Sequence, residues 1–503
     1  MVVTRSHAMI WERKMALTSR RKFLWQTSLA TVTLCGFQSK AVATAALAFD
    51  GRSQDVAPID AASFRKFASQ ITGNVITPEM SVYDSTRSVF NRAFDRHPAA
   101  IVRCAVPSDV ARSLDFAQNK NLQVAVRGGG HSRLGYGVCD GGLVIDLSGM
   151  NRVEVDAAKR IARAEAGALV CQLDRATQRF GLATTSGGCP TVGIAGLTLG
   201  GGEGHLMPKY GAACDNLRSA QVVTVDGKLV QASQKSYADL FWAIRGGGGN
   251  FGVVTALEYQ LHRVGPVLSG ALTYPAGRIP ELVQAFARFL EGAPDEMDAF
   301  AQLLPSEQGR RLKVDVFYCG DPRMGNDLVK PLRALSPEED SIKVKSYLEA
   351  QAGSGFLVAP VAHFQTNLFL RELSAPAIAA ITTAVTHAPA TCKLIIVSLR
   401  GAVSRVNVSD MAFALRQPGY EVDIAGVWNA PAQREDVVRW VQATRENLQP
   451  FAHGVYVNQL GDTSDELVRS AYGPNYARLL EIKKKYDPSN LLRLNQNIKP
   501  NEA

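Results

Sequence analysis

The segment Arg127-Gly-Gly-Gly-His131-Ser132 directly follows residues 123–127, whose side chains alternate between apolar and polar as in a half-buried strand. Three consecutive glycines let neighbouring backbone N–H groups converge on one anion, as the binding of a diphosphate requires. No Gly-Lys-Ser/Thr follows and no Gly-x-Gly-x-x-Gly opens a helix nearby, which excludes a Walker loop and a Rossmann fingerprint. By itself the run also fits a structural turn beside a packed histidine.

Glycine is concentrated around this segment. Of the 43 glycines, 25 lie between Gly128 and Gly252, which indicates that the backbone there approaches a ligand or another backbone closely. The sequence between the glycine runs predicts further strands, a hairpin with a tight turn at Asp226-Gly227, and a capped amphipathic helix. In chain order these are the helix 107–118, the strands 123–127, 143–147 and 160–164, and the hairpin 222–230. They predict an α+β domain over residues 60–262.

The pattern changes after Pro266, where glycine becomes less frequent and longer helical stretches begin. The predicted helices and strands are 279–290, 375–386, 393–399 and 420–428. They predict a second domain, residues 266–450, in which an antiparallel sheet is covered by helices. The final segment, residues 451–503, contains a predicted helix over 464–485 that Asp487-Pro488 stops.

Charge and length favour small-molecule chemistry. At 503 residues and 46% apolar content, the chain is long enough for two or three domains. Residues 1–48 hold seven Lys or Arg and one acid, so they supply six of the nine formal positive charges. The remainder is too weakly basic for nucleic-acid binding, which needs basic residues clustered on one surface.

The first 48 residues have the pattern of an export signal. Ser19-Arg-Arg-Lys-Phe-Leu24 opens an uncharged stretch that runs to Ser39, and small residues follow up to Ala48. Paired arginines before Phe-Leu resemble a twin-arginine signal, which implies the Tat export machinery as a partner and a periplasmic or extracellular location. A chance Arg-Arg pair is the alternative. The uncharged stretch is too short and too weakly apolar to predict a stable membrane anchor.

The eight cysteines contain no Cys-x-x-Cys pair, which disfavours a zinc ribbon or a thioredoxin-type site, and no metal site is predicted. Cys35 lies in the leader, so seven cysteines remain. An odd number leaves at least one cysteine unpaired or committed to another bond.

The order of the motifs resembles the berberine bridge enzyme-like branch of the FAD-linked oxidases with the PCMH (vanillyl-alcohol oxidase-type) fold. The resemblance extends in family order over about 400 residues. The motifs are Arg127-Gly-Gly-Gly-His-Ser-Arg-Leu-Gly-Tyr136, Gly142-Leu-Val-Ile-Asp-Leu147, Gly187-Gly-Cys-Pro-Thr-Val-Gly-Ile-Ala-Gly196, Leu199-Gly-Gly-Gly-Glu-Gly204, Lys209-Tyr-Gly211, Asp215-Asn216, Asp239 to Val254, Tyr472-Gly-Pro-Asn475 and Tyr486 to Pro500. The resemblance implies a two-part FAD-binding domain, a substrate domain over the flavin, and a C-terminal segment that packs back on the first domain.

The resemblance also implies how FAD is held. In the bicovalent members of the family, the histidine and cysteine at the positions of His131 and Cys189 bond to the flavin 8α-methyl group and C6. Cys189 stands in a Gly-Gly-Cys-Pro turn, which suits a thiol that faces a ligand, although a buried inert cysteine is the alternative. The other residues expected at the FAD are Arg127, Gly128, Gly129, Gly130, Ser132, Val192, Gly193, Gly196, Val253, Val254, Asn495 and Asn497.

Hydride removal from an alcohol or hemiacetal carbon is easier if a base takes the hydroxyl proton at the same time. Many relatives carry Tyr-x-Asn-Tyr, whose second tyrosine is the usual candidate; this chain has Tyr456 at the first position and Gln459 at the second. Tyr456 is therefore the first candidate base. Tyr420, Glu421 and Asp423 are rivals, and an alternating strand puts Glu421 and Asp423 on one face and Tyr420 on the other. A packed tyrosine and a solvated strand face are the alternatives.

Val192 resembles the small residue that family oxidases place where oxygen enters, which favours O2 as the electron acceptor. The sequence thus predicts an FAD-dependent oxidase acting on a sugar or a secondary metabolite. A dehydrogenase with another acceptor is the nearest alternative. A flavin-retaining binding protein that has lost turnover is the other, because Gln459 cannot accept a proton.

Overall fold

The computed structural model describes residues 61–501 apart from 308, 354–358 and 463. The predicted signal segment and Cys35 lie outside the described residues. The described residues belong to one compact unit. None of the helices in the described part is long and apolar enough to cross a membrane.

The first sheet carries the glycine-rich segment at one end. Its strand order is β1(Asn74–Ile76), β2(Ala100–Arg103), β4(Leu143–Asp146), β3(Val124–Arg127), and the last three strands are parallel. Helix α3(Pro107–Asn119) connects β2 to β3, which confirms the predicted helix and strand. The start of α3 differs from the expected cap, because Val106 has no capping side chain and the buried Asp109 instead accepts hydrogen bonds from the N–H groups of Thr72, Gly73 and Ala105.

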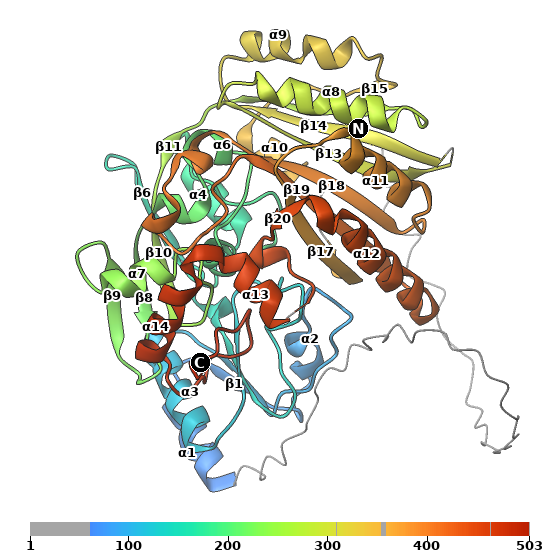
Figure 1. Ribbon diagram of the computed structural model, residues 1–503. Coiled ribbons are helices and arrows are strands. Elements are labelled where there is room, and N and C mark those ends of the chain that lie inside the picture. The colour runs from blue at the N-terminus through green and yellow to red at the C-terminus, as the bar shows by residue number, and fades with distance from the viewer. Residues whose placement is uncertain (1–60, 308, 354–358, 463, 502–503) are drawn as a thin grey trace, which may run out of the picture. The chain divides into compact units, whose positions relative to one another are not determined.

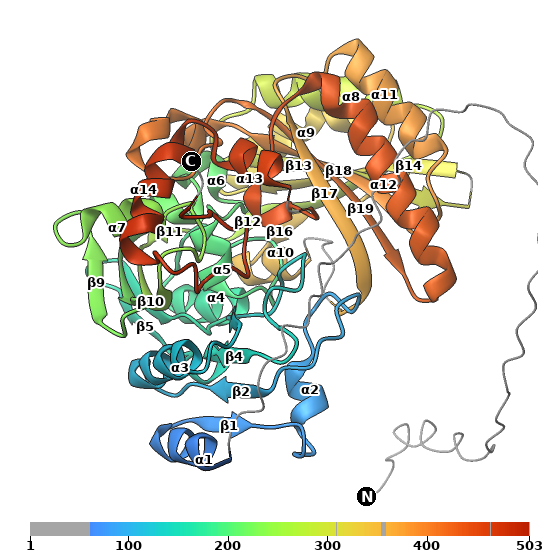
Figure 2. The same ribbon diagram turned by 60° about the horizontal axis from the view of Figure 1, so that its bottom comes forward.

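The second sheet is antiparallel, with strand order β5(Val153–Asp156), β6(Ile161–Glu165), β10(Val253–Gln260), β8(Leu217–Val223), β9(Leu229–Ser233). Strands β8 and β9 form the predicted hairpin, and Gly227 has the positive φ of 78° that its tight turn requires. The glycine-rich region also forms the short helices α4(Val170–Gln178), α5(Ile194–Leu199) and α6(Met207–Tyr210). Helices α4 and α5 pack against β5 and β10 of this sheet (Figure 2), whereas α6 contacts β13 of the third sheet.

Within the described residues, the third sheet has nine antiparallel strands and confirms the predicted helix-covered sheet. It contains β12(Val267–Tyr274), β13(Met297–Ser306), β14(Gly309–Tyr318), β15(Glu339–Asp340), β16(Lys343–Lys345), β17(Ala362–Leu370), β18(Cys392–Leu399), β19(Gly419–Trp428) and β20(Ala452–Gly454). The helices α8(Ile279–Glu291), α11(Ala375–Thr386) and α12(Arg434–Leu448) pack on one face, as Figure 1 shows, and α9(Pro322–Arg333) packs beside α8. Alternation along the strands sends every second side chain to the other face.

The predicted helix over 464–485 is wrong in its continuity. The structure has α13(Asp465–Tyr472), a 3-10 turn and α14(Tyr476–Tyr486). Gly473 has a positive φ of 49° and Pro474 follows it, so the helical hydrogen-bond ladder is interrupted there. The C-terminal segment contacts the first domain through Lys483, whose buried ammonium donates to the carbonyl oxygen of Asn250 (3.0 Å). Lys483 also donates to the Asp487 carboxylate in the same segment (2.7 Å).

Candidate active site

A cavity of about 340 Å³ lies between the glycine-rich segments and the third sheet. This is within the range of roughly 300 to 1,000 Å³ that is usual for small-molecule sites. One side is formed by residues 127–133, 187–197 and 252–254, and the C-terminal residues 492–496 close one edge. Phe300 of β13, Val397 of β18 and Asp423 of β19 line it from the sheet face that α8, α11 and α12 leave open.

The two turns predicted to carry covalent bonds meet backbone to backbone. A Cβ atom at Gly129 would lie 2.2 Å from the backbone nitrogen of Gly193, so only glycine allows this contact. At Gly196 a Cβ would meet nothing within 4 Å and would project into open space. Glycine therefore has two roles here: it joins the turns, and it keeps space for a ligand.

His131 lies in the cavity wall with its ring stacked on Phe90 at a centroid distance of 3.9 Å. Burial, with a smaller contribution from the Arg133 guanidinium, lowers the pKa of His131 to about 3. The imidazole is therefore neutral at physiological pH. A neutral ring keeps a nitrogen lone pair that can attack an electrophilic carbon.

Cys189 also lines the cavity, and its Sγ lies 3.5 Å from the hydroxyl of Thr191. The seven cysteines of the described part are all free of disulfides. The turn before Cys189 is held from behind by Gln351 of α10(Tyr347–Ala352), whose amide donates to the carbonyl oxygen of Gly187 and to the Asp174 carboxylate. These contacts hold the backbone that presents the thiol.

Several buried polar atoms of the residues expected at the FAD have no hydrogen-bonding partner in the described part of the chain. They are Nη1 of Arg127, Oδ1 of Asn495 and Oδ1 of Asn497, whereas Nη2 of Arg127 is paired with Asp146 at 2.9 Å. Open donors and acceptors in these residues fit the polar groups of the expected FAD. Most of the other residues expected at FAD also line the cavity, namely Gly128, Gly130, Ser132, Val192, Gly193, Val253 and Val254, whereas Asn497 does not.

A cluster of three carboxyls occupies the opposite wall. Asp423 lines the cavity, Glu421 lies behind it, and Glu203 reaches them from the first domain. Both oxygens of Glu421 and Oδ1 of Asp423 have no donor among the described residues, so hydrogen bonds between these carboxyls require that one of them is protonated. Burial raises the pKa of Glu203 to about 7 and that of Asp423 to about 6, and it raises the pKa of Glu421 well above its usual value. The cluster therefore shares protons at neutral pH.

The sequence analysis assigned no catalytic or binding role to Glu203. It stands within Leu199-Gly-Gly-Gly-Glu-Gly204, and the signal that could have found it is an acid surrounded by glycines. His205, two residues later, also lines the cavity, and its Nδ1 lies 2.8 Å from the carboxylate of Asp298 on β13.

Tyr456 lies at the cavity wall and is 2% exposed. Its hydroxyl oxygen accepts hydrogen bonds from the N–H of Gly202 (2.9 Å) and the amide of Asn458 (3.0 Å). Burial and the nearby Glu203 nevertheless raise the pKa of Tyr456 well above 10. The phenol is thus protonated at neutral pH.

Gln459 links two side chains by hydrogen bonds and cannot serve as a base. Its Oε1 accepts hydrogen bonds from Nε of Arg133 and from the amide of Gln365, both at 2.9 Å. The structure separates the three candidates on β19 as the strand alternation requires. Glu421 and Asp423 share the cavity-side face, whereas Tyr420 is half-buried and is not among the cavity-lining residues.

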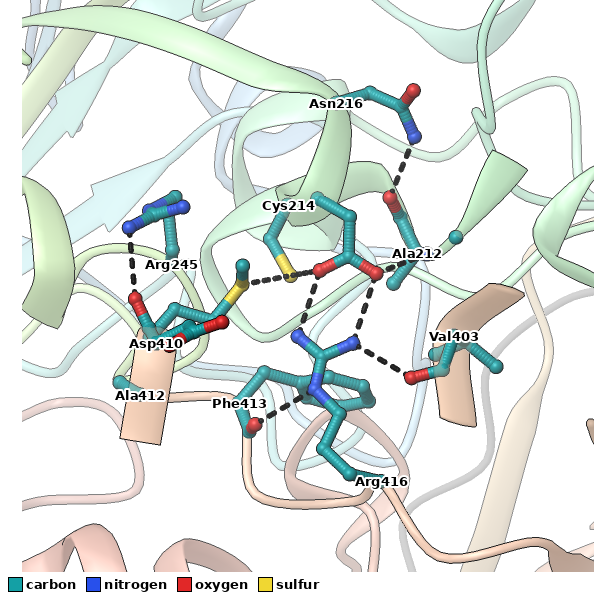
Figure 3. Close-up of polar contacts among 12 residues, drawn as sticks. Ala212, Cys214, Asn216, Arg245, Val403, Asp410, Ala412, Phe413 and Arg416 are labelled. Carbon is teal, nitrogen blue, oxygen red and sulfur yellow. Dashed lines mark hydrogen bonds and ion pairs between the residues drawn. The ribbon is translucent and has the colours of Figure 1, made fainter. Parts of the chain in front are cut away.

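A buried ion pair joins the loop between β18 and β19 to the first domain. Arg416, in the loop between β18 and β19, binds the Asp215 carboxylate through both terminal nitrogens at 2.9 and 2.7 Å (Figure 3). Arg416 also donates to the carbonyl oxygen of Val403 at 3.1 Å. The same loop places Phe413 edge-on to the ring of Tyr456, with centroids 6.0 Å apart.

Comparison with known proteins identifies similar chains over most of this length. A family model described as FAD binding domain matches residues 98–233, and one described as berberine and berberine like matches residues 455–499. The (R)-6-hydroxynicotine oxidase of Paenarthrobacter nicotinovorans is 33% identical, and the match covers 86% of this chain and 97% of that protein. A FAD-linked oxidoreductase of Bacillus subtilis is 30% identical over 86% of this chain and 98% of its own length. The crystal structure of 6-hydroxy-D-nicotine oxidase from Arthrobacter nicotinovorans matches with a TM-score of 0.80 and 29% identity over 86% of this chain and 98% of that one.

Proposed function

This chain belongs to the berberine bridge enzyme-like FAD-linked oxidoreductases, and from that premise we propose that it oxidises an alcohol, hemiacetal or related carbon of a small molecule with O2 as acceptor. FAD, when bound, accepts the hydride at N5 and supplies the redox chemistry. The observation that carries the proposal is one cavity with the His131 and Cys189 turns on one wall and the Asp423 carboxyl on the other. Val192 lines the same cavity, which supports an oxidase over a dehydrogenase.

His131 and Cys189 would hold the FAD by two covalent bonds, one from each side chain. Three features support this: both side chains line the cavity, the imidazole is neutral, and the two turns touch at Gly129 and Gly193. A tether suits an exported enzyme, which cannot easily replace a lost cofactor.

Asp423 is the base that takes the substrate proton. With a pKa raised to about 6, it is largely ionised at neutral pH and still basic enough to accept a proton. Tyr456 ranked first in the sequence reading, but its raised pKa keeps the phenol protonated, so it orients groups in the cavity instead. The alternative of a binding protein without turnover rested on Gln459, which cannot accept a proton. If Asp423 is the base, catalysis does not need a base at position 459.

The test is extraction of the flavin by acid precipitation, with peroxide release measured on the same samples against oligosaccharides, aromatic alcohols and amines. The wild-type flavin stays with the protein. His131→Ala or Cys189→Ala alone also retains it through the surviving bond, whereas the double variant releases it. Quantitative release from the wild type contradicts the tether at both residues. Flavin that no substrate in the panel reduces contradicts the oxidase.

Export through the Tat machinery to the periplasm or outside the cell is part of the proposal. It is supported by the paired arginines and by the enclosed cofactor site. A protein that encloses its cofactor must cross the membrane already folded, and the Tat machinery exports folded proteins. Replacing Arg20 and Arg21 with Lys is expected to leave yellow, active protein in the cytoplasm. Normal appearance of the double variant outside the cytoplasm contradicts the signal assignment.

A further inference from the structure

The carboxyl cluster is larger than proton transfer requires. A single ionised carboxyl is enough for a general base. Here Glu203 and Asp298 line the cavity together with Asp423, and Glu421 lies behind them at 1% exposure. The additional carboxyls therefore need another explanation.

Two cations, Arg133 and Lys393, lie near this cluster. Within the described residues, Glu203, Glu421 and Asp423 form no ion pair with a Lys, Arg or His side chain. Arg133 and Lys393 lie close enough to lower the pKa of Asp423, but the Nε of Arg133 is directed to Gln459.

The remaining groups around the cluster are His205, which bonds to Asp298 at 2.8 Å, and the phenol of Tyr456. Buried carboxylates without a partner are costly, so each must hold a proton or face a cation. Asp423 meets the cavity with one oxygen unpaired, so a ligand can supply that cation.

We propose that the substrate carries a protonated amine, which binds between Glu203 and Asp423, and that Glu203 is the residue that selects it. This inference rests on the proposed function, because it concerns the same cavity. Asp298 adds negative potential from the third sheet. An ammonium group donates to both carboxylates at once and replaces the protons that the cluster otherwise retains.

A neutral polyol is the competing ligand, and proton release separates the two. Hydroxyl groups form hydrogen bonds with protonated and ionised carboxyls alike, so a polyol displaces few protons. A cation favours the ionised form, so it lowers the pKa of both carboxyls and expels a proton to the solvent. Since burial raises the pKa of Glu203 to about 7 and that of Asp423 to about 6, we expect the proton release in this pH range.

The experiment is calorimetric titration of the flavin-loaded protein with benzylamine and with its neutral analogue benzyl alcohol. Each titration is made in phosphate and in HEPES buffer, whose different heats of ionisation give the number of protons released. We expect benzylamine to release up to about one proton and to bind more tightly as pH rises through this range, and benzyl alcohol to release almost none.

Glu203→Gln keeps the size of the side chain and removes its charge. We expect it to weaken benzylamine binding roughly 10- to 100-fold, to reduce the proton release and to change benzyl alcohol binding much less. The matched control is Glu258→Gln, since Glu258 is a half-buried glutamate of the same domain that does not line the cavity. We expect the Glu258→Gln variant to bind benzylamine with the wild-type affinity.

The visible absorbance of the flavin in the same samples separates the two hypotheses. Wild-type protein without flavin contradicts the proposed function. Flavin-loaded wild type that binds benzyl alcohol as tightly as benzylamine, binds benzylamine without releasing protons, or does not bind it, overturns the amine inference alone. This comparison needs no variant, so it remains decisive if Glu203→Gln does not fold.

Discussion

Gly129→Ala tests whether the contact between the two turns positions the two proposed flavin bonds. The added methyl group would lie 2.2 Å from the Gly193 nitrogen and 2.7 Å from its Cα, whereas ordinary contact begins at 3.4 Å. The turns must therefore separate by about 1.2 Å. Both clashing atoms belong to the backbone, so no side-chain rotation relieves the contact. Overpacking of this kind costs roughly 1 to 3 kcal/mol.

A displacement of this size matters more for bond formation than for folding. A misplacement of about 1 Å at a reacting group lowers a rate on the order of 10²-fold. We expect Gly129→Ala to fold and to bind FAD, but to lose the bond at His131, at Cys189 or at both. Acid precipitation measures the attached fraction, and mass spectrometry of the flavin peptides identifies the bond that remains.

Gly265→Ala is the matched control, because a Cβ there meets nothing within 4 Å and Gly265 lies in an exposed connection outside the cavity. It should retain the wild-type attachment. If Gly129→Ala forms both bonds at the wild-type rate, the contact with Gly193 does not position the flavin, and the reasoning from the close approach is wrong.

Three further predictions concern single residues. Asp423→Asn should slow flavin reduction by roughly 10² to 10⁴-fold. It should also remove the rise in rate with pH near 6, because a base with a pKa of about 6 is protonated and inactive below that pH. Stopped-flow measurement of flavin reduction across this pH range checks both effects. Tyr456→Phe should retain more activity than Asp423→Asn in the same assay, and a larger loss would return the base to the tyrosine. Arg416→Met leaves Asp215 buried without its cation and should destabilise the protein by about 3 to 5 kcal/mol. Thermal unfolding should then show a fall in Tm of roughly 3 to 5 °C from the unfolding entropy per residue, while the double change with Asp215→Asn should cost less than the two single changes added together.

The elements that the sequence predicted well are those set by local patterns. The alternation at 143–147 and 420–428, the Asp226-Gly227 turn and the apolar periodicity of 279–290 each depend on residues close in sequence, and each appears in the structure near its expected bounds. The error in the helix over 464–485 has the same kind of cause. The overall periodicity of that stretch was weighed more heavily than Gly473-Pro474, which interrupts it.

The residues expected to hold the cofactor could be named from the sequence because most of them lie in two short motifs. His131 and Cys189 stand in glycine-rich turns, and the cavity brings both turns to one wall. The carboxyl cluster on the opposite wall could not be predicted from the sequence. Glu203 lies more than 200 positions before Glu421 and Asp423, and no local pattern announces that the three carboxyls meet.

The amino-acid sequence by itself determined the strands, the hairpin, the glycine-rich region, and the family to which the chain belongs. Those properties arise from backbone conformation and from side chains a few residues apart. The tertiary structure alone decided which titratable groups meet, and with that their protonation. A pKa depends on burial and on nearby charges, and for Glu203, Asp423 and Tyr456 both come from segments that are distant in the chain. The change of the candidate base from Tyr456 to Asp423 is therefore a consequence of folding.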